Sequence, residues 1–286
     1  MPELPEVELV KRDLEEIIDT TIIDYELSNY VIKGHKENKR TIVKQSLDEF
    51  KKVENSTILT LGRRGKYMYF LLGKEKENFH LVSHLGMSGA FFIVNDIEDI
   101  LEDNFRKHWQ VKFFLDNGKI LVYSDIRRFG EMRTVDTLEN FPPIANMAPE
   151  YTDVSARDHF IETLKSGKYD ESYIKPIIMD SKILPGVGNI YASEALYLSK
   201  ILPTKKVKNI SRKRLSLLFD AIVEVFELSL SSGGSTISDY RSVTGGSGEM
   251  QNKFKVYGLK YCPLGHELKT KVMSGRNTYY CTKCQR

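Results

Sequence analysis

The chain has 286 residues and a mass of 32.9 kDa, with 41% hydrophobic and 28% charged residues. This balance is typical of a globular protein and excludes a disordered, collagen-like or mucin-like chain, while the length predicts two or three domains. No apolar run reaches the roughly 20 residues of a membrane-spanning helix, and residues 1–3 lack the basic and apolar regions of a signal peptide, so we expect a cytoplasmic protein.

Between residues 7 and 18, apolar side chains recur at three- and four-residue steps, which predicts a helix that begins near Pro5. From residue 21 to residue 135, short apolar runs separated by turn sequences such as Asp116-Asn117-Gly118 predict β-strands. A long first helix closing several short strands predicts a β-sandwich or barrel. The strands expected are 57–61, 66–72, 79–85, 90–94, 111–115 and 120–123.

The pattern becomes helical after Phe141-Pro142-Pro143, a sequence that predicts a linker. The helices expected are 156–165, 173–179, 190–198 and 213–230. A double-turn sequence at 184–189 ends where the third of these helices begins, and backbone N–H groups at a helix start can bind an anion. A structural turn in a helix hairpin is the simpler interpretation. Residues 245–248 predict a mobile loop, and residues 254–257 predict a strand.

The basic charge is concentrated toward the end of the chain. Residues 200–286 carry 16 Lys and Arg against 6 Asp and Glu, whereas residues 1–199 carry 26 against 33. This asymmetry favours a polyanionic partner, and nucleic acid ranks ahead of an anionic membrane because no basic amphipathic stretch with a strong apolar face is present. A basic surface that contacts only solvent explains the charge equally well.

All three cysteines lie in the last 25 residues, which indicates a metal site rather than a disulfide framework. Cys262, His266, Cys281 and Cys284 form a C-x3-H-x14-C-x2-C arrangement of ligands that suits tetrahedral zinc. Four protein ligands leave no open position, so the expected ion is structural. Free thiols beside a chance histidine are the alternative.

The N-terminus offers a second reactive group. If Met1 is removed, Pro2 exposes a secondary amine at the start of a helix, where the positive end of the helix dipole favours the neutral, nucleophilic form. Such an amine can attack an electrophilic sugar carbon and form a Schiff base. First-turn acids that complement the helix dipole are the simpler interpretation of Glu3, Glu6 and Glu8.

Eight short strings occur in order along the chain: MPELPEVE (1–8), RGKY (64–67), HLGMSG (84–89), RRFG (127–130), IKP (174–176), MD (179–180), PGVGNIYASEAL (185–196), and Arg276 ahead of Cys281. Together they resemble the bacterial formamidopyrimidine-DNA glycosylases, enzymes that remove oxidised purines such as 8-oxoguanine. The resemblance runs from Pro2 to Gln285. It implies an α+β fold: an N-terminal β-sandwich with flanking helices (1–138), a helix-two-turn-helix domain (144–240) and a C-terminal zinc β-hairpin (252–286).

The resemblance also assigns roles to individual residues. Pro2 matches the Schiff-base nucleophile and Glu3 the proton donor of the glycosylase step, while Lys66 and Arg276 match the proton donors for β- and δ-elimination. It implies a monomer that acts on duplex DNA containing oxidised bases or abasic sites, with one structural zinc ion. An exposed cation without a role is the alternative for Lys66 and Arg276.

An enzyme that works on a base takes it out of the stack and must fill the space left behind. Met87, Arg127 and Phe129 match the family's void-filling residues, although ordinary core packing explains Met87 or Phe129 when each is considered alone. The remaining candidate DNA contacts are His108, Asn189, Glu6 and His84, the last being equally explained as a buried structural histidine.

The chain departs from the family pattern at three places. The usual zinc ligands are four cysteines, but Gly265 stands at the second position and His266 follows it, which we interpret as a change of ligand. Ile126 replaces a common proline before the arginine pair, which could loosen that loop. Residues 241–252, which match a loop that closes over the extruded base, are rich in glycine and serine and do not resemble the usual form of that loop.

The sequence therefore predicts a bifunctional DNA glycosylase and abasic-site lyase for oxidised purines. An endonuclease VIII-like glycosylase for oxidised pyrimidines is the nearest alternative enzyme, and MPELPEVE, HLGMSG and RRFG favour the purine enzyme. A catalytically silent protein that binds lesions without cutting is the alternative of another class.

Overall fold

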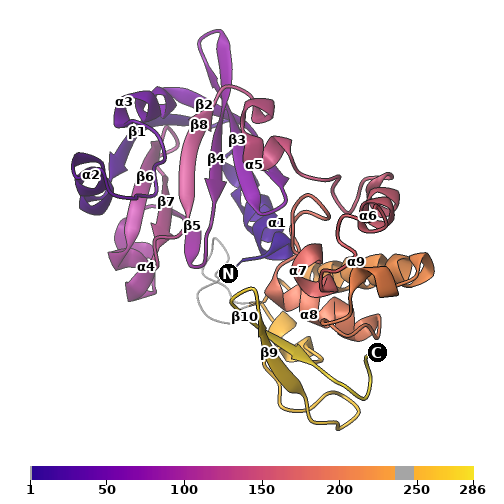
Figure 1. The fold of residues 1–286 in the computed structure, drawn as a ribbon. Helices are drawn as coiled ribbons and strands as arrows, with labels where there is room; N and C mark the ends of the chain where they lie inside the picture. The colour runs from indigo at the N-terminus through magenta and orange to yellow at the C-terminus, as the bar shows by residue number, and fades with distance from the viewer. Residues whose placement is uncertain (1, 236–247) are drawn as a thin grey trace. The chain divides into compact units, whose positions relative to one another are not determined.

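The computed structural model describes residues 2–235 and 248–286, and it divides the chain into two compact units (Figure 1). Of the described residues, the first unit contains Pro2, Glu6–Ala145, 233–235 and 248–249, and the second contains Glu3–Pro5, Asn146–Ser232 and Met250–Arg286. The loop expected at residues 245–248 lies outside the described residues except for Gly248. Within the described part of the chain, every helix is too short or too polar to cross a lipid bilayer.

Within its described residues, the first unit is built from eight antiparallel strands, in the order β5-β7-β6-β1-β2-β3-β4-β8. They are β1 (Thr21–Leu27), β2 (Ser56–Arg64), β3 (Tyr67–Lys74), β4 (Glu77–His84), β5 (Gly89–Val94), β6 (Trp109–Leu115), β7 (Ile120–Asp125) and β8 (Glu131–Val135). The helices are α1 (Leu4–Asp13), η1 (Leu14–Ile17), α2 (Asn29–Lys36), α3 (Leu47–Phe50), η2 (Lys51–Val53), η3 (Ile97–Asp99), α4 (Asp103–Lys107), η4 (Leu138–Asn140) and α5 (Pro142–Ala145).

This continuous series of strands folds over so that its two halves pack face to face, as a sandwich does. Four strands separate β3, which carries Phe70, from β5, which carries Phe91, yet the two ring centroids are 5.9 Å apart. Register shifts in β1, β2 and β6 mark places where extra residues bend the strands. The predicted N-terminal β-sandwich is therefore confirmed, with its core shared between both halves.

Six of these strands coincide with the apolar runs of the sequence, and β1 and β8 do not. In β1 only Ile22 is buried, and in β8 only Met132 is buried. With one buried residue each, neither the central strand β1 nor the edge strand β8 shows the alternation of buried and exposed residues that sequence patterns detect.

Helices build the second unit around the buried helix α8, against which α9 packs. The elements are α6 (Ala156–Leu164), α7 (Ile174–Ile178), α8 (Asn189–Leu198), η5 (Val207–Asn209), α9 (Arg212–Ser231), η6 (Met250–Lys253), β9 (Lys269–Met273) and β10 (Arg276–Tyr280). The double turn 184–189 leads directly into α8, and β9 and β10 pair as the antiparallel hairpin drawn in yellow in Figure 1. All four helices match the helical periodicity of the sequence to within one or two residues.

Two local predictions were wrong. Residues 254–257 form no strand, because the backbone N–H groups of Lys255, Val256 and Tyr257 donate to a side chain, the carboxylate of Glu194, instead of to a neighbouring strand. The supposed linker at residues 141–143 contains the start of α5, since proline fits the first turn of a helix, where no N–H donor is needed.

Candidate functional site

Glu3 is the centre of a buried polar site in the second unit. Only 1% of its surface is exposed, and its carboxylate accepts N–H groups from Gly188 (2.8 Å), Ile190 (2.8 Å) and Tyr191 (3.3 Å) at the start of α8. The free N–H groups and the dipole of a helix start stabilise the ionised form of such a carboxylate. The anion accommodated by the double-turn sequence is therefore the protein's own side chain.

The glycines of the double turn make room for residues 3 and 4. A Cβ atom on Gly188 would lie 2.2 Å from the Cδ atom of Glu3, and one on Gly186 would lie 2.4 Å from the Cβ atom of Leu4. The N–H group of Leu4 also donates to the carbonyl of Gly186 at 3.2 Å. Gly186 has a φ of +88°, which glycine adopts without strain.

Lys175, on α7, is a buried cation in the same unit that the sequence analysis did not single out. It is 1% exposed, and its ammonium group donates to the Oδ1 atom of Asn189 and, at 2.8 Å, to the Oγ1 atom of Thr278. Burial lowers the pKa of Lys175 to about 8, while the charge of Glu3 raises this pKa and that of Arg276 lowers it. The ammonium group of Lys175 therefore titrates close to physiological pH.

Asn189 and Arg276, both predicted from the sequence, lie beside this lysine. The side-chain amide of Asn189 donates to the backbone carbonyl of Asn277 at 3.0 Å and to the hydroxyl of Tyr257 at 3.3 Å. Arg276 precedes Asn277 at the start of β10 and is exposed. The second unit thus gathers Glu3, Lys175, Asn189 and Arg276 into one site with one acid and two cations.

Glu194 is a second buried acid that the sequence analysis missed. It is 1% exposed, lies in the middle of α8 and accepts the N–H groups of Lys255 (2.7 Å), Val256 (3.0 Å) and Tyr257 (2.7 Å). Burial raises the pKa of Glu194, and these three hydrogen bonds oppose the rise. The carboxylate fixes the segment that carries Tyr257. A charged residue within the apolar run 190–198 was the available signal.

Cys262, His266, Cys281 and Cys284 come together as predicted, with their ligand atoms all within 4.8 Å of one another. The Nδ1 atom of His266 lies 3.6, 3.8 and 3.3 Å from the sulfur atoms of Cys262, Cys281 and Cys284, and the sulfur atoms of Cys262 and Cys284 are 3.8 Å apart. Tetrahedral zinc with bonds of about 2.3 Å to sulfur and about 2.0 Å to nitrogen separates its ligands by about 3.8 Å (sulfur to sulfur) and about 3.5 Å (sulfur to nitrogen). The cluster fits a zinc ion, with His266 as one ligand.

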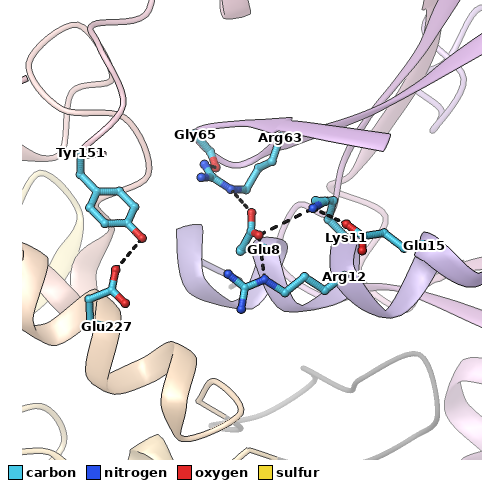
Figure 2. Close-up of polar contacts among 8 residues, drawn as sticks. All are labelled: Glu8, Lys11, Arg12, Glu15, Arg63, Gly65, Tyr151 and Glu227. Carbon is cyan, nitrogen blue, oxygen red and sulfur yellow. Dashed lines mark hydrogen bonds and ion pairs between the residues drawn. The ribbon is translucent and has the colours of Figure 1, made fainter. Parts of the chain in front are cut away.

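In the first unit, Lys66 lies in the turn between β2 and β3, beside Gly65 at a φ of +56°. Figure 2 shows how Arg63 supports this turn: its guanidinium donates to the carbonyl of Gly65 at 3.1 Å and to the carboxylate of Glu8 on α1 at 3.0 Å. Burial alone would raise the pKa of Glu8, but hydrogen bonds from Arg63 and Arg12 and the charges of Arg63 and Lys11 hold this pKa below its usual value.

His84 lies at the end of β4 and packs against Tyr67 with the two rings tilted by 57° and 4.8 Å between their centroids. Burial, and to a lesser extent the charge of Lys66, lowers the pKa of His84 to about 4, so its ring is neutral at pH 7. Its Nδ1 atom accepts the N–H group of Gly86 at 3.0 Å, which assigns the proton to Nε2. His84 is therefore a neutral donor.

The three void-filling candidates also lie in the first unit. Phe129 is 47% exposed, which is unusual for a phenylalanine, and Arg127 is exposed with its guanidinium carbon 5.6 Å from the Phe129 ring centroid. Met87 is half-buried. Ile126, which replaces a common proline, packs against the buried cluster beneath this loop.

The other predicted residues have the following places. Pro2 and Glu6 are buried, and the carboxylate of Glu6 accepts the N–H group (2.9 Å) and the hydroxyl (3.1 Å) of Ser235. His108 follows α4, and its Nδ1 atom lies 2.7 Å from the carbonyl of Asn104. The structure describes no residue between Ser235 and Gly248. Glu6 therefore contacts the last residue described before that interval.

Comparison with known proteins defines the class. Two family models match the chain, the formamidopyrimidine-DNA glycosylase N-terminal domain over residues 1–132 and the H2TH domain of the same family over residues 148–241. The formamidopyrimidine-DNA glycosylases of Bdellovibrio bacteriovorus and Streptococcus thermophilus are each 33% identical, over 290 and 293 residues, and the matches cover 100% of both chains.

Solved structures agree with these relatives. A Lactococcus lactis FPG mutant in complex with a Fapy-dG containing DNA matches with a TM-score of 0.84, and MutM in complex with carbocyclic 8-oxo-G containing DNA matches with a TM-score of 0.83. Each is 32% identical and covered over its full length, as is this chain. The fold is that of a DNA-repair glycosylase. The chain belongs to the formamidopyrimidine-DNA glycosylase family, as its sequence predicted.

Proposed function

We propose that this protein removes oxidised purines, such as 8-oxoguanine and formamidopyrimidines, from duplex DNA and then cleaves the strand at the abasic site. The observation that carries the proposal is the Glu3 carboxylate, held by α8 next in sequence to Pro2 and in one site with Lys175, Asn189 and Arg276. The proposal is also supported by relatives crystallised with Fapy-dG and 8-oxo-G DNA.

In the proposed first step, removal of Met1 exposes the amine of Pro2, which attacks the sugar carbon C1′ and displaces the damaged base. Glu3 takes the proton that the amine loses and delivers it to the sugar ring oxygen, and the ring then opens to an iminium ion joined to Pro2. A carboxylate that starts ionised can accept this proton, which agrees with its hydrogen bonds to α8.

In the later steps, Lys66 and Arg276 assist β- and δ-elimination by placing positive charge beside the phosphates that leave. Lys175, Asn189, His84 and His108 supply donors and charge to the phosphate backbone, which positions the duplex without reading its sequence.

Extrusion of the damaged base leaves a gap in the helix, which Met87, Arg127 and Phe129 fill in this proposal. The exposure of Phe129 supports this role, since a phenylalanine side chain that binds no other molecule is normally buried. Glu6, next to the start of the segment after Ser235, contacts the extruded base.

Cys262, His266, Cys281 and Cys284 hold one zinc ion, whose contribution is to fold the β9–β10 hairpin that carries Arg276. We further propose domain boundaries of 1–138, 144–240 and 252–286, a monomeric state and a cytoplasmic location in contact with the nucleoid.

Excision assays test the substrate. A duplex with 8-oxoguanine opposite cytosine should be cleaved faster than one with thymine glycol, and the reverse order supports the endonuclease VIII-like alternative. Borohydride reduction of a reaction with an abasic duplex should give a covalent adduct, with the sugar on Pro2 by mass spectrometry. The Pro2→Gly and Glu3→Gln variants should give little adduct. Tight binding by the unaltered protein without an adduct supports the silent lesion-binding protein.

A further inference from the structure

The strings HLGMSG and RRFG, far apart in the sequence, are joined by one buried carboxylate. Asp125 ends β7 and is 0% exposed. Its Oδ1 atom accepts the hydroxyl of Ser88 at 2.7 Å and the N–H group of Arg128 at 3.0 Å, and its Oδ2 atom accepts the N–H group of Gly130 at 2.7 Å. One side chain therefore fixes the backbone on both sides of Phe129.

Ser88, in the string HLGMSG, completes the hydrogen-bonded link to the string RRFG. Its oxygen donates to Asp125 and accepts the N–H group of Arg127 at 2.7 Å, and the same N–H group lies 3.2 Å from the Oδ1 atom of Asp125. Ser88 is buried and directly follows Met87. The hydrogen-bonded set of Ser88, Asp125 and Arg127 therefore ties the backbone next to Met87 to the backbone of the arginine pair.

Close packing leaves the two strings little freedom to slide. A Cβ atom on Gly86 would lie 2.4 Å from the backbone nitrogen of Gly130, and one on Gly130 would lie 1.9 Å from the hydroxyl oxygen of Tyr123. Arg128 holds a φ of +59° and places its guanidinium carbon 3.9 Å from the ring centroid of Tyr30. A non-glycine residue keeps such a backbone only when its surroundings enforce it.

We propose that Asp125 and Ser88 are positioning residues that hold Met87, Arg127 and Phe129 in one fixed arrangement, so that the three enter the duplex as a single wedge. The inference rests on the proposed function, because it assigns the support behind the void-filling residues. Opening a base step costs a few kcal/mol, and a wedge that is already ordered loses less conformational entropy when it enters. The carboxylate supplies this order in a loop where Ile126 replaces a common proline.

Three variants test the inference. Ser88→Ala and Asp125→Asn remove the anchor. Ser124→Ala is a matched control, because Ser124 is a buried serine next to Asp125 whose hydroxyl has no hydrogen-bond partner among the described residues. Three readouts apply: excision of 8-oxoguanine from a duplex, borohydride trapping on a single-stranded abasic oligonucleotide, and fluorescence of 2-aminopurine placed beside the lesion. The single strand has no stacked partner to displace, so its trapping reports chemistry without the wedge.

Ser88→Ala should slow duplex excision about tenfold or more, as loss of a hydrogen bond to a charged group implies, and should reduce the 2-aminopurine signal. Single-strand trapping and the melting temperature should stay close to those of Ser124→Ala. Equal duplex excision by Ser88→Ala and Ser124→Ala overturns the inference, and so does an equal loss on both substrates. If Asp125→Asn fails to fold, Ser88→Ala still decides.

Failure of the proposed function looks different. In that case the unaltered protein gives no trapped adduct on either substrate, and the 2-aminopurine signal of the Ser88→Ala and Ser124→Ala complexes still reports whether the wedge depends on its anchor.

Discussion

Replacing Gly188 with alanine should inactivate the enzyme by displacing Glu3. The added Cβ atom would lie 2.2 Å from the Cδ atom of Glu3 and 2.4 Å from its Oε1 atom. Carbon atoms pack at about 3.5–4.0 Å, so the carboxylate must move by about 1.3 Å or more. Gly188 has φ −122° and ψ −161°, which alanine also adopts, so the effect comes from the collision alone.

The structure sets the size of this effect. A shift of that length breaks the 2.8 Å hydrogen bonds from Gly188 and Ile190, since contacts beyond about 3.5 Å no longer count as hydrogen bonds. Misplacing a reacting group by about 1 Å costs on the order of 100-fold in rate. We therefore expect excision of 8-oxoguanine to fall about 100-fold, with duplex binding changed much less, because the mutation leaves the surface cations in place.

Single-turnover excision, borohydride trapping and thermal melting together check this prediction. Gly73→Ala is the control, because its added Cβ atom would lie 2.9 Å from the Cδ1 atom of Leu59, a 38% exposed side chain that can move, and 3.4 Å from the Oδ1 atom of Asn78, an ordinary contact. In a Glu3→Gln background, Gly188→Ala should cause little further loss, since both changes act on the same carboxylate. Wild-type excision by Gly188→Ala, or losses that add fully in the double variant, would refute the reasoning.

Three further predictions concern titration and metal. Duplex affinity measured by fluorescence anisotropy should weaken between pH 7 and pH 9, because Lys175 loses its proton near its pKa of about 8. Lys175→Arg should make the affinity less dependent on pH. The same pH dependence in Lys175→Arg as in the unaltered protein contradicts a role for the charge of Lys175. Because the pKa of Glu8 is lowered from 4.5, its ion pair with Arg63 stabilises the fold above that pH and loses effect as acid protonates it. Glu8→Gln should therefore reduce the free energy of unfolding by about 2 kcal/mol at pH 7 and by less below pH 4, whereas a pH-independent difference contradicts the ion pair. Atomic absorption should find one zinc ion per chain. His266→Ala should lose the ion to a chelator at least about tenfold faster than the unaltered protein, and His266→Cys should retain it. Equal rates of zinc loss from the unaltered protein and both variants exclude residue 266 as a ligand.

The sequence did not reveal the buried charged residues of the site. Lys175 and Glu194 lie in helices whose periodicity was recognised, but periodicity reports which face of a helix is buried and not which donors or acceptors meet it there. The partners of Glu194 lie about 60 residues further along, in a segment that looked like a strand. The same segment shows why that prediction failed, because its N–H groups are used by a carboxylate.

The spacing of residues along the chain was sufficient to predict the structure wherever the contacts are local or belong to a recognisable motif. The order of the eight strings determined the family, and the spacing of three cysteines and a histidine determined the metal cluster, since a short hairpin leaves those ligands few other arrangements. Tertiary structure decided the rest: Glu3 meets Gly188 across 185 positions, and Ser88 meets Asp125 across 37. Contacts of this kind depend on how complete elements pack, and neither propensity nor periodicity carries that information.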